Sequence, residues 1–245
     1  MPTALNALEL TGRARTHVRA ATAPRCALQP EALSALQGLR AAAARAGIDA
    51  QPVSSFRDFN HQLAIWNDKF SGARPVLDRD SRALTVTGLS ETERVAAILV
   101  WSALPGASRH HWGTDCDLID RAALPAGAAV QLLSVDFAPG GRYARLAAWL
   151  DAHAADYGFF RPYDQDRGGV LPEPWHLSYA PLAEPALAAM SPALLRAALQ
   201  SAPLLGYASV APQLAQLFDR YVAQVAEAPP AARLARALNR ATTPV

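Results

Sequence analysis

Two short segments, far apart in the chain, contain the side chains best suited to metal chemistry. The first, from Ser108 to Asp117, reads Ser-Arg-His-His-Trp-Gly-Thr-Asp-Cys-Asp, and the second, from Glu173 to His176, reads Glu-Pro-Trp-His. Together they offer His110, Asp117 and His176 as three metal ligands, with Glu173 beside them. Three nitrogen and oxygen ligands that leave a position for water are typical of a catalytic zinc site, whereas a structural site is closed and usually rich in cysteine.

Two of these ligands have an alternative nearby. His111 adjoins His110, but the seven-residue step from His110 to Asp117 (117 − 110 = 7) favours His110. Asp115 is the main rival of Asp117, because an additional carboxylate two residues away could bind the metal or tune it. We therefore expect His110 and Asp117 to be the ligands, with His111 and Asp115 as the alternatives.

The position of Glu173 follows from the proline after it. A residue that precedes proline is driven away from the helical region, so a helical Glu-x-x-His pair is not expected. On an unbroken strand, positions three apart face opposite sides, and Glu173 and His176 could not reach one ion. We therefore expect Glu173 on a loop before a strand over 175–179, with Pro174 providing the bend that turns the carboxylate toward the water at the metal.

This combination of side chains suits the hydrolysis of an amide. Zinc lowers the pKa of a coordinated water to about 7 and polarises a carbonyl oxygen. Glu173 would take a proton from the water and later deliver it to the leaving amine. Arg57 follows an expected strand over 49–56, where its guanidinium could pair with a substrate carboxylate or with the oxyanion of the tetrahedral intermediate.

The elements that must position these residues are indicated by apolar spacing and capping signals. Examples are the leucines at helical spacing after Pro30, the capping box formed by Ser90 and Glu93, and the alternation of polar and apolar residues over 115–120. We expect helices over 30–47, 58–70, 90–101 and 140–157, strands over 49–56, 115–120, 130–137 and 175–179, and a hairpin over 75–88. The strand over 115–120 is expected to be half-buried, with Asp115 and Asp117 on one face and Cys116 and Leu118 on the other. The loop over 159–169 is expected to form a wall of the site.

Composition excludes several classes of protein. The chain of 245 residues is 51% hydrophobic and 18% charged, which is typical of a globular protein and not of a disordered or fibrous one. Its net charge is +2, and a single lysine leaves no basic run for nucleic acid, so no nucleic-acid partner is expected. No apolar run approaches the roughly 20 residues of a transmembrane helix. The two cysteines exclude a disulfide scaffold but not one bridge.

The two segments resemble the motifs of a known family, the zinc D-Ala-D-Ala metallopeptidases. The resemblance rests on Ser-x-His-x-x-Gly-x-x-x-Asp in the first segment and Glu-x-Trp-His in the second. The family's upstream aromatic-Arg-x-x-x-x-Gln element also appears, as Phe56, Arg57 and Gln62. The similarity covers roughly residues 54–179, about half of the chain. One departure is Asp115, since the family often has a small residue at that position.

The resemblance implies a role for each matched residue. The implied roles are zinc ligation for His110, Asp117 and His176, general base catalysis for Glu173, transition-state or carboxylate binding for Arg57, and substrate binding for Ser108 and Gln62. The implied fold is α+β, a small mostly antiparallel sheet flanked by helices, as in hedgehog signalling domains. An irregular arm over 1–30, a zinc peptidase domain over 31–185 and a helical C-terminal extension over 186–245 complete the expected organisation. The extension would pack on the domain or mediate self-association.

The function implied by the resemblance is that of a zinc-dependent D,D-carboxypeptidase acting on peptidoglycan stem peptides. A D-Ala-D-Ala dipeptidase or a peptidoglycan endopeptidase of the same fold is the alternative among enzymes, and a non-catalytic zinc-binding module is the alternative outside them. The N-terminus shows no basic region followed by an apolar one, so the sequence by itself indicates a cytoplasmic location, although the implied substrate belongs to the cell wall. Oligomeric state stays open.

Overall fold

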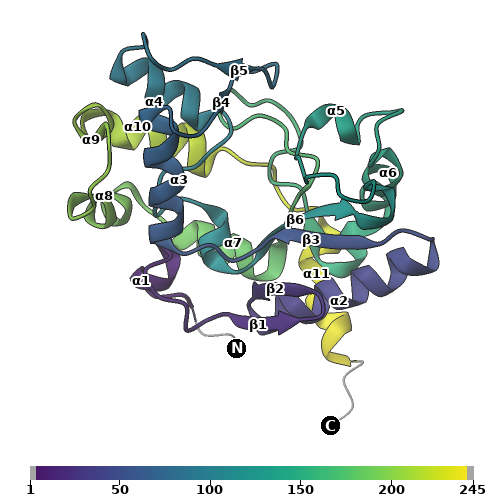
Figure 1. Ribbon diagram of the computed structural model, residues 1–245. Helices are drawn as coiled ribbons and strands as arrows, with labels where there is room; N and C mark the ends of the chain where they lie inside the picture. Colours follow the sequence, from purple (N-terminus) through teal and green to yellow (C-terminus); the bar gives the residue numbers. More distant parts are fainter. Residues whose placement is uncertain (1–3, 242–245) are drawn as a thin grey trace.

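The computed structural model describes residues 4–241, which form an α+β protein around one small antiparallel sheet (Figure 1). The strands lie in the order β3-β6-β8-β7, and each neighbouring pair is antiparallel. The bounds of these strands are Ala50–Ser54 for β3, Asp115–Asp120 for β6, Phe159–Phe160 for β7 and His176–Tyr179 for β8. This architecture confirms the expected fold class.

Helices surround the sheet, and two small hairpins lie outside it (Figure 1). The α-helices are α1 (Ala7–Leu10), α2 (Pro30–Arg45), α3 (Phe59–Ser71), α4 (Glu91–Leu99), α5 (Ser134–Phe137), α6 (Ala144–His153), α7 (Ala180–Ala189), α8 (Pro192–Gln200), α9 (Tyr207–Val210), α10 (Leu214–Phe218) and α11 (Pro230–Ala241). Shorter turns are the 3₁₀ helices η1 (Arg109–Trp112), η2 (Arg121–Ala123), η3 (Ala154–Tyr157) and η4 (Ala211–Gln213) and the π-helix η5 (Asp219–Ala223). The hairpins are β1 (Arg19–Thr22) with β2 (Arg25–Leu28) and β4 (Val76–Leu77) with β5 (Ala83–Leu84). Within residues 4–241, no helix combines the length and apolarity needed to cross a bilayer.

The central strand β6 separates the core from the site. Its apolar residues Cys116 and Leu118 join the core cluster that also contains leucines of α2 and α6. Asp115 and Asp117, on the other face, both approach His176 of β8. The expected division of the faces is confirmed. The expected half-burial is wrong, because all six residues of the strand are buried between structure on both sides.

The helices begin and end where local signals indicate. Asp58 caps α3 by accepting a hydrogen bond from the amide of His61, and Gly72 ends the helix with a φ of 83° that favours glycine. The predicted capping box of Ser90 and Glu93 is present at the start of α4. The expected hairpin over 75–88 is also confirmed, with strands of two residues each.

The strand expected over 130–137 is wrong. That stretch is irregular as far as α5 and then turns once as a helix. Its alternating apolar residues do not share a buried face, because Val130 and Val135 are exposed while Phe137 packs against Tyr143 and Trp175. Phe137 is buried, but no described strand pairs with this stretch. The β preference of its residues is therefore not sufficient to form a strand.

The expectation of an irregular N-terminal arm is wrong for the residues that the structure describes. Residues 4–30 contain α1 and the β1–β2 hairpin. Asn6 and Glu9 form a capping box at the start of α1, a signal that is legible in the sequence. Residues 1–3 of the arm lie outside the described part of the chain.

The C-terminal extension is helical and packs on the rest of the protein. Leu195 and Leu199 of α8 belong to one buried cluster with Phe59 and Trp66 of α3. The indole nitrogen of Trp66 donates a hydrogen bond to the carbonyl of Leu205, at 3.0 Å. Residues 242–245 of the predicted extension are outside the described part.

Leu199→Ala is expected to lower the free energy of unfolding by about 2–5 kcal/mol, because it leaves a cavity in the buried cluster that Leu199 shares with Phe59 and Trp66 of α3. Denaturant unfolding followed by tryptophan fluorescence measures the effect. Leu205→Ala, at an exposed position, should change stability by less than about 0.5 kcal/mol. Equal stability of the two variants would show that the extension does not share the core.

Candidate active site

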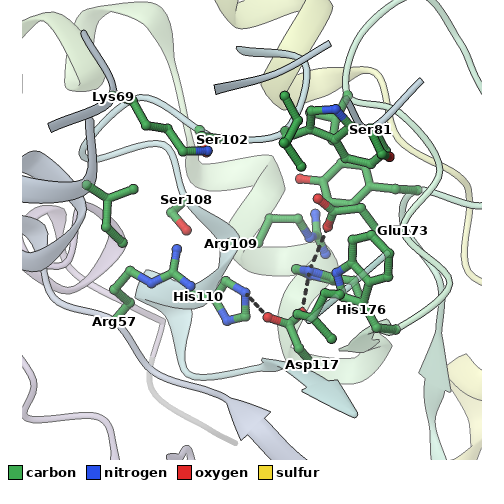
Figure 2. A pocket seen from close by; sticks show the side chains of 18 of the residues that line it. Arg57, Lys69, Ser81, Ser102, Ser108, Arg109, His110, Asp117, Glu173 and His176 are labelled. Carbon is green, nitrogen blue, oxygen red and sulfur yellow. Dashed lines mark hydrogen bonds and ion pairs between the residues drawn. The ribbon is translucent and has the colours of Figure 1, made fainter. Parts of the chain in front are cut away.

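The three predicted metal ligands meet on one face of the sheet (Figure 2). His110 lies in η1, and the register of the sheet places Asp117 of β6 directly opposite His176 of β8. Asp117 Oδ2 is 3.4 Å from His110 Nε2, and its Oδ1 is 3.2 Å from His176 Nδ1. One ligand atom from each residue lies within 4.8 Å of those of the other two, so the group could hold a metal ion.

Backbone turns bring η1 to the sheet. Gly113 ends η1 with a φ of 63°, and a Cβ at this position would lie 2.3 Å from Val18 Cγ1. A side chain is therefore excluded both by conformation and by space. The amide of Arg57 donates a hydrogen bond to the carbonyl of His110 at 3.2 Å, which ties the end of β3 to the ligand segment.

The donor set fits a divalent cation. Asp117 Oδ1 and His110 Nδ1 are buried and make no hydrogen bond, although buried polar atoms are nearly always paired. Among the described residues, neither Asp117 nor Glu173 forms an ion pair with an arginine or a lysine. Two carboxylates and two imidazoles that form no ion pair with a described arginine or lysine suit an ion with a charge of +2.

The pKa values of the site indicate the same preference. Burial by itself would raise the pKa of Asp117, but His110 and His176 lower it below that of an ordinary aspartate. Burial by itself would lower the pKa of His176, but the carboxylates of Asp115, Asp117 and Glu173 raise it well above that of an ordinary histidine. The site thus stabilises an added positive charge, which a metal ion would supply in competition with the proton.

Asp115, the rival ligand, lies behind His176. Its Oδ1 accepts a hydrogen bond from Arg109 Nε at 2.9 Å and is 3.0 Å from His176 Nε2. Its Oδ2 accepts a hydrogen bond from the hydroxyl of Thr114. Because the other ring nitrogen of His176 faces Asp117, this geometry favours Asp115 as the carboxylate that orients the histidine, an arrangement frequent behind metal-bound histidines.

His111, the rival histidine, has both ring nitrogens occupied. Nε2 accepts a hydrogen bond from the amide of Gly106 at 3.0 Å, so Nδ1 must be the donor to the carbonyl of Arg57 at 2.6 Å. Burial lowers the pKa of His111 to about 3, which keeps the ring neutral. His111 therefore holds the backbone around the site, and His110 is the histidine of this segment in the group that could hold a metal ion.

Glu173 lies on the irregular segment before β8, as the proline argument requires. A turn at Pro174 and Trp175 separates it from the strand. Its amide donates to the carbonyl of Tyr163 at 2.9 Å, and its own carbonyl accepts from the amide of His176 at 3.1 Å. These bonds bring Glu173 Oε2 within 3.2 Å of His176 Nδ1, on the side that faces Asp117.

Arg57 and Gln62 act as a pair. Arg57 Nη1 donates to Gln62 Oε1 at 2.8 Å, and Nη2 donates to the hydroxyl of Ser54 at 3.1 Å. The amide nitrogen of Gln62 donates in turn to the carbonyl of Ala103. Gln62 thus lies behind Arg57, away from the cavity wall, and holds the guanidinium in place. Its predicted contact with substrate stays a prediction.

A cavity of about 380 Å³ opens over this group. The predicted residues on its wall are Arg57, Ser108, His110, Asp117, Glu173 and His176. The loop over 159–169 contributes Tyr163, whose ring packs edge-on against His176 at 5.2 Å. Burial raises the pKa of Tyr163 to about 12, so the phenol stays neutral.

Lys69 and Arg109 also line the cavity, although neither was predicted from the sequence as a site residue (Figure 2). Lys69 has a signal in the sequence, because it lies four residues after Ile65, which also lines the cavity, and hence on the same face of α3. Arg109 sits inside the predicted segment, but only its contact with Asp115 reveals a role.

Comparison with known proteins defines first the class and then the family. A sequence model described as VanY, D-alanyl-D-alanine carboxypeptidase, matches residues 25–182. With the fold and the site, this match defines the protein as a hydrolase of the D,D-peptidase class. Since the match covers more than half of the chain, the chain belongs to the VanY family of D-alanyl-D-alanine carboxypeptidases.

Individual proteins are similar to this chain in sequence or in fold. Two uncharacterized proteins of Haemophilus influenzae are similar in sequence. One is 36% identical over 121 residues, covering 49% of this chain and 92% of the relative. The other is 43% identical over 98 residues, covering 39% and 67%. The solved structure of VanYB in complex with D-alanine-D-alanine has a TM-score of 0.50 at 19% identity over 75% of this chain and 88% of that one, which shows a shared fold.

Proposed function

We propose that this protein is a zinc-dependent D,D-carboxypeptidase that hydrolyses the terminal D-Ala-D-Ala bond of peptidoglycan stem peptides. The observation that carries the proposal is the convergence of Glu173 with His110, Asp117 and His176 in a cavity also lined by Arg57. Membership of the VanY family and the D-alanine-D-alanine bound to VanYB support the substrate class.

Each side chain has a task in this reaction. His110, Asp117 and His176 would hold zinc, which when bound supplies Lewis acidity and makes water a nucleophile near neutral pH. Glu173 takes a proton from the attacking water and delivers it to the amine of the leaving D-alanine. Arg57, held by Gln62, binds the terminal carboxylate or the developing oxyanion, both of which suit its fixed guanidinium.

The cavity favours a substrate longer than a dipeptide. It extends past the metal ligands to an apolar wall that includes Trp101, Val130 and Leu132. Trp101 stacks on Trp175, which also lines the cavity, with ring centroids 6.2 Å apart. Further residues of a stem peptide would lie there, which supports a carboxypeptidase over the alternative D-Ala-D-Ala dipeptidase. An endopeptidase is the other enzymatic alternative, and the presence of Glu173 argues against a non-catalytic zinc module.

The test is hydrolysis of a stem pentapeptide before and after treatment with a chelator. We expect one equivalent of D-alanine and a tetrapeptide, loss of activity on chelation, and recovery when zinc is added back, as measured by chromatography and metal analysis. Free D-Ala-D-Ala and a cross-linked peptide are the comparison substrates. Turnover that a chelator leaves intact would rule out the zinc mechanism, and preferred cleavage of free D-Ala-D-Ala would favour the dipeptidase.

A further inference from the structure

Lys69 is the only lysine of the chain, and it points into the cavity (Figure 2). It lies in the last turn of α3, and its ammonium donates a hydrogen bond to the hydroxyl of Ser102 at 2.6 Å. A lysine in the last turn stabilises a helix through its interaction with the helix dipole. This interaction does not require the side chain to leave the solvent. The half-buried position against Ser102 calls for another explanation.

The wall around Lys69 carries three basic side chains that form no ion pair with a described residue. Arg57 and Arg74 line the same cavity, and among the described residues neither these arginines nor Lys69 forms an ion pair with a carboxylate. Burial, together with the positive charges of Arg74 and Arg57, lowers the pKa of Lys69 to about 8, although Glu173 partly offsets this. A partly desolvated ammonium that has a hydroxyl as its hydrogen-bond partner but no ion pair favours an anion that enters the cavity.

Lys69 and Arg57 reach the cavity from different points of the chain. Arg57 precedes α3 and is held by Gln62 near the start of that helix, whereas Lys69 lies in its last turn. A peptide with two anionic groups could therefore contact both cations.

We propose that Lys69, Ser102 and Arg74 form a second carboxylate-binding subsite, which holds an acidic group of the peptide upstream of the carboxylate bound by Arg57. The inference rests on the proposed function, since it names the substrate class of the same cavity. That class is stem peptides with a free carboxylate near the third residue. The carboxylate is either the side-chain carboxylate of a diaminopimelate at that residue or the α-carboxylate of the γ-linked D-glutamate before it.

Matched pentapeptides separate these two sources. Diaminopimelate differs from lysine at the third residue by one carboxylate, and D-glutamate differs from D-isoglutamine at the second residue by the charge of one group. For the pair that contains the recognised carboxylate, we expect kcat/KM of the wild-type protein to be at least about tenfold higher with the acidic peptide, as for charge-assisted hydrogen bonds.

Variants assign this preference to Lys69. Lys69→Met is expected to bring the ratio of kcat/KM between the matched peptides to about 1, and Lys69→Arg to keep most of the preference. Arg82→Met removes the same charge from the exposed turn of the β4–β5 hairpin, outside the cavity wall, and should leave the ratio unchanged. An equal loss for acidic and neutral peptides in Lys69→Met would assign Lys69 to the terminal carboxylate and overturn the proposal.

A labelling experiment tests the subsite without turnover. The single lysine can be modified with an amine reagent and followed by mass spectrometry, with the N-terminal amine as an internal reference. The acidic peptide is expected to slow modification of Lys69 in the Glu173→Gln protein, and its neutral match to slow it less. If the wild type hydrolyses none of the peptides, the proposed function fails. The subsite is then tested by the difference in Lys69 modification between the acidic peptide and its neutral match. Equal rates for both members of each pair in the wild type, or no differential protection, would overturn the subsite and leave the proposed function standing.

Discussion

Glu173→Gln is expected to lower kcat by about 10²–10⁴-fold, the usual contribution of a positioned general base. The amide of glutamine has nearly the shape of the carboxylate but cannot accept the proton of the attacking water. Glu173 Oε2 lies 3.2 Å from His176 Nδ1, so the change removes a base at the cavity and not a distant charge. Turnover of a stem pentapeptide, measured under saturating substrate, gives the effect.

The matched control for this variant is Glu184→Gln, which removes a carboxylate that pairs with Arg233 outside the cavity. Its kcat should equal that of the wild type. Metal content is determined for the wild type, Glu173→Gln and Glu184→Gln. A loss of turnover in Glu173→Gln can be assigned to the missing base only if this variant still binds one metal ion per chain. A Glu173→Gln protein with its metal in place and full turnover would mean that another group takes the proton.

Asp117→Asn and Asp115→Asn are expected to differ in metal binding, although the same chemical change is made two residues apart on one face of β6. Asp117→Asn should abolish measurable binding, because it removes one of three ligands. Asp115→Asn should weaken binding by about 10–100-fold, the effect of losing the group that orients a ligand histidine. Competition with a chromophoric chelator measures both affinities without any need for turnover.

The stability of the metal-free protein provides a second measurement for Asp115→Asn. Asp115 is fully buried, and its carboxylate accepts a hydrogen bond from Arg109 at 2.9 Å. Removing one partner of a buried ion pair costs about 3–5 kcal/mol, so Asp115→Asn should unfold at a much lower denaturant concentration. If Asp115→Asn binds metal as tightly as the wild type, Asp115 does not orient His176, whatever its effect on stability.

The local elements were largely predictable because their signals lie within a few residues of one another. The helix from Phe59 to Ser71 begins at an aspartate cap and ends at a glycine in the left-handed region, and its apolar spacing was legible between these points. For residues 130–137 the prediction of a strand was wrong, because an alternation of apolar and polar residues forms a strand only where a neighbouring strand can pair with it. The short helix α1 was not predicted, although the residues of its capping box, Asn6 and Glu9, can be recognised in the sequence.

The sequence by itself determined the donor chemistry of this protein: two histidines, an aspartate and a glutamate in two motifs, with a proline that forces the glutamate off the strand. Only the tertiary structure decided which carboxylate faces the site. Asp115 and His176 are 61 residues apart, and their separation in space depends on the register of β6 against β8. The same register turns one nitrogen of His176 toward Asp117 and the other toward Asp115, which Arg109 holds. Such contacts arise when strands pair and a core closes around them, so no local pattern in either motif contains them.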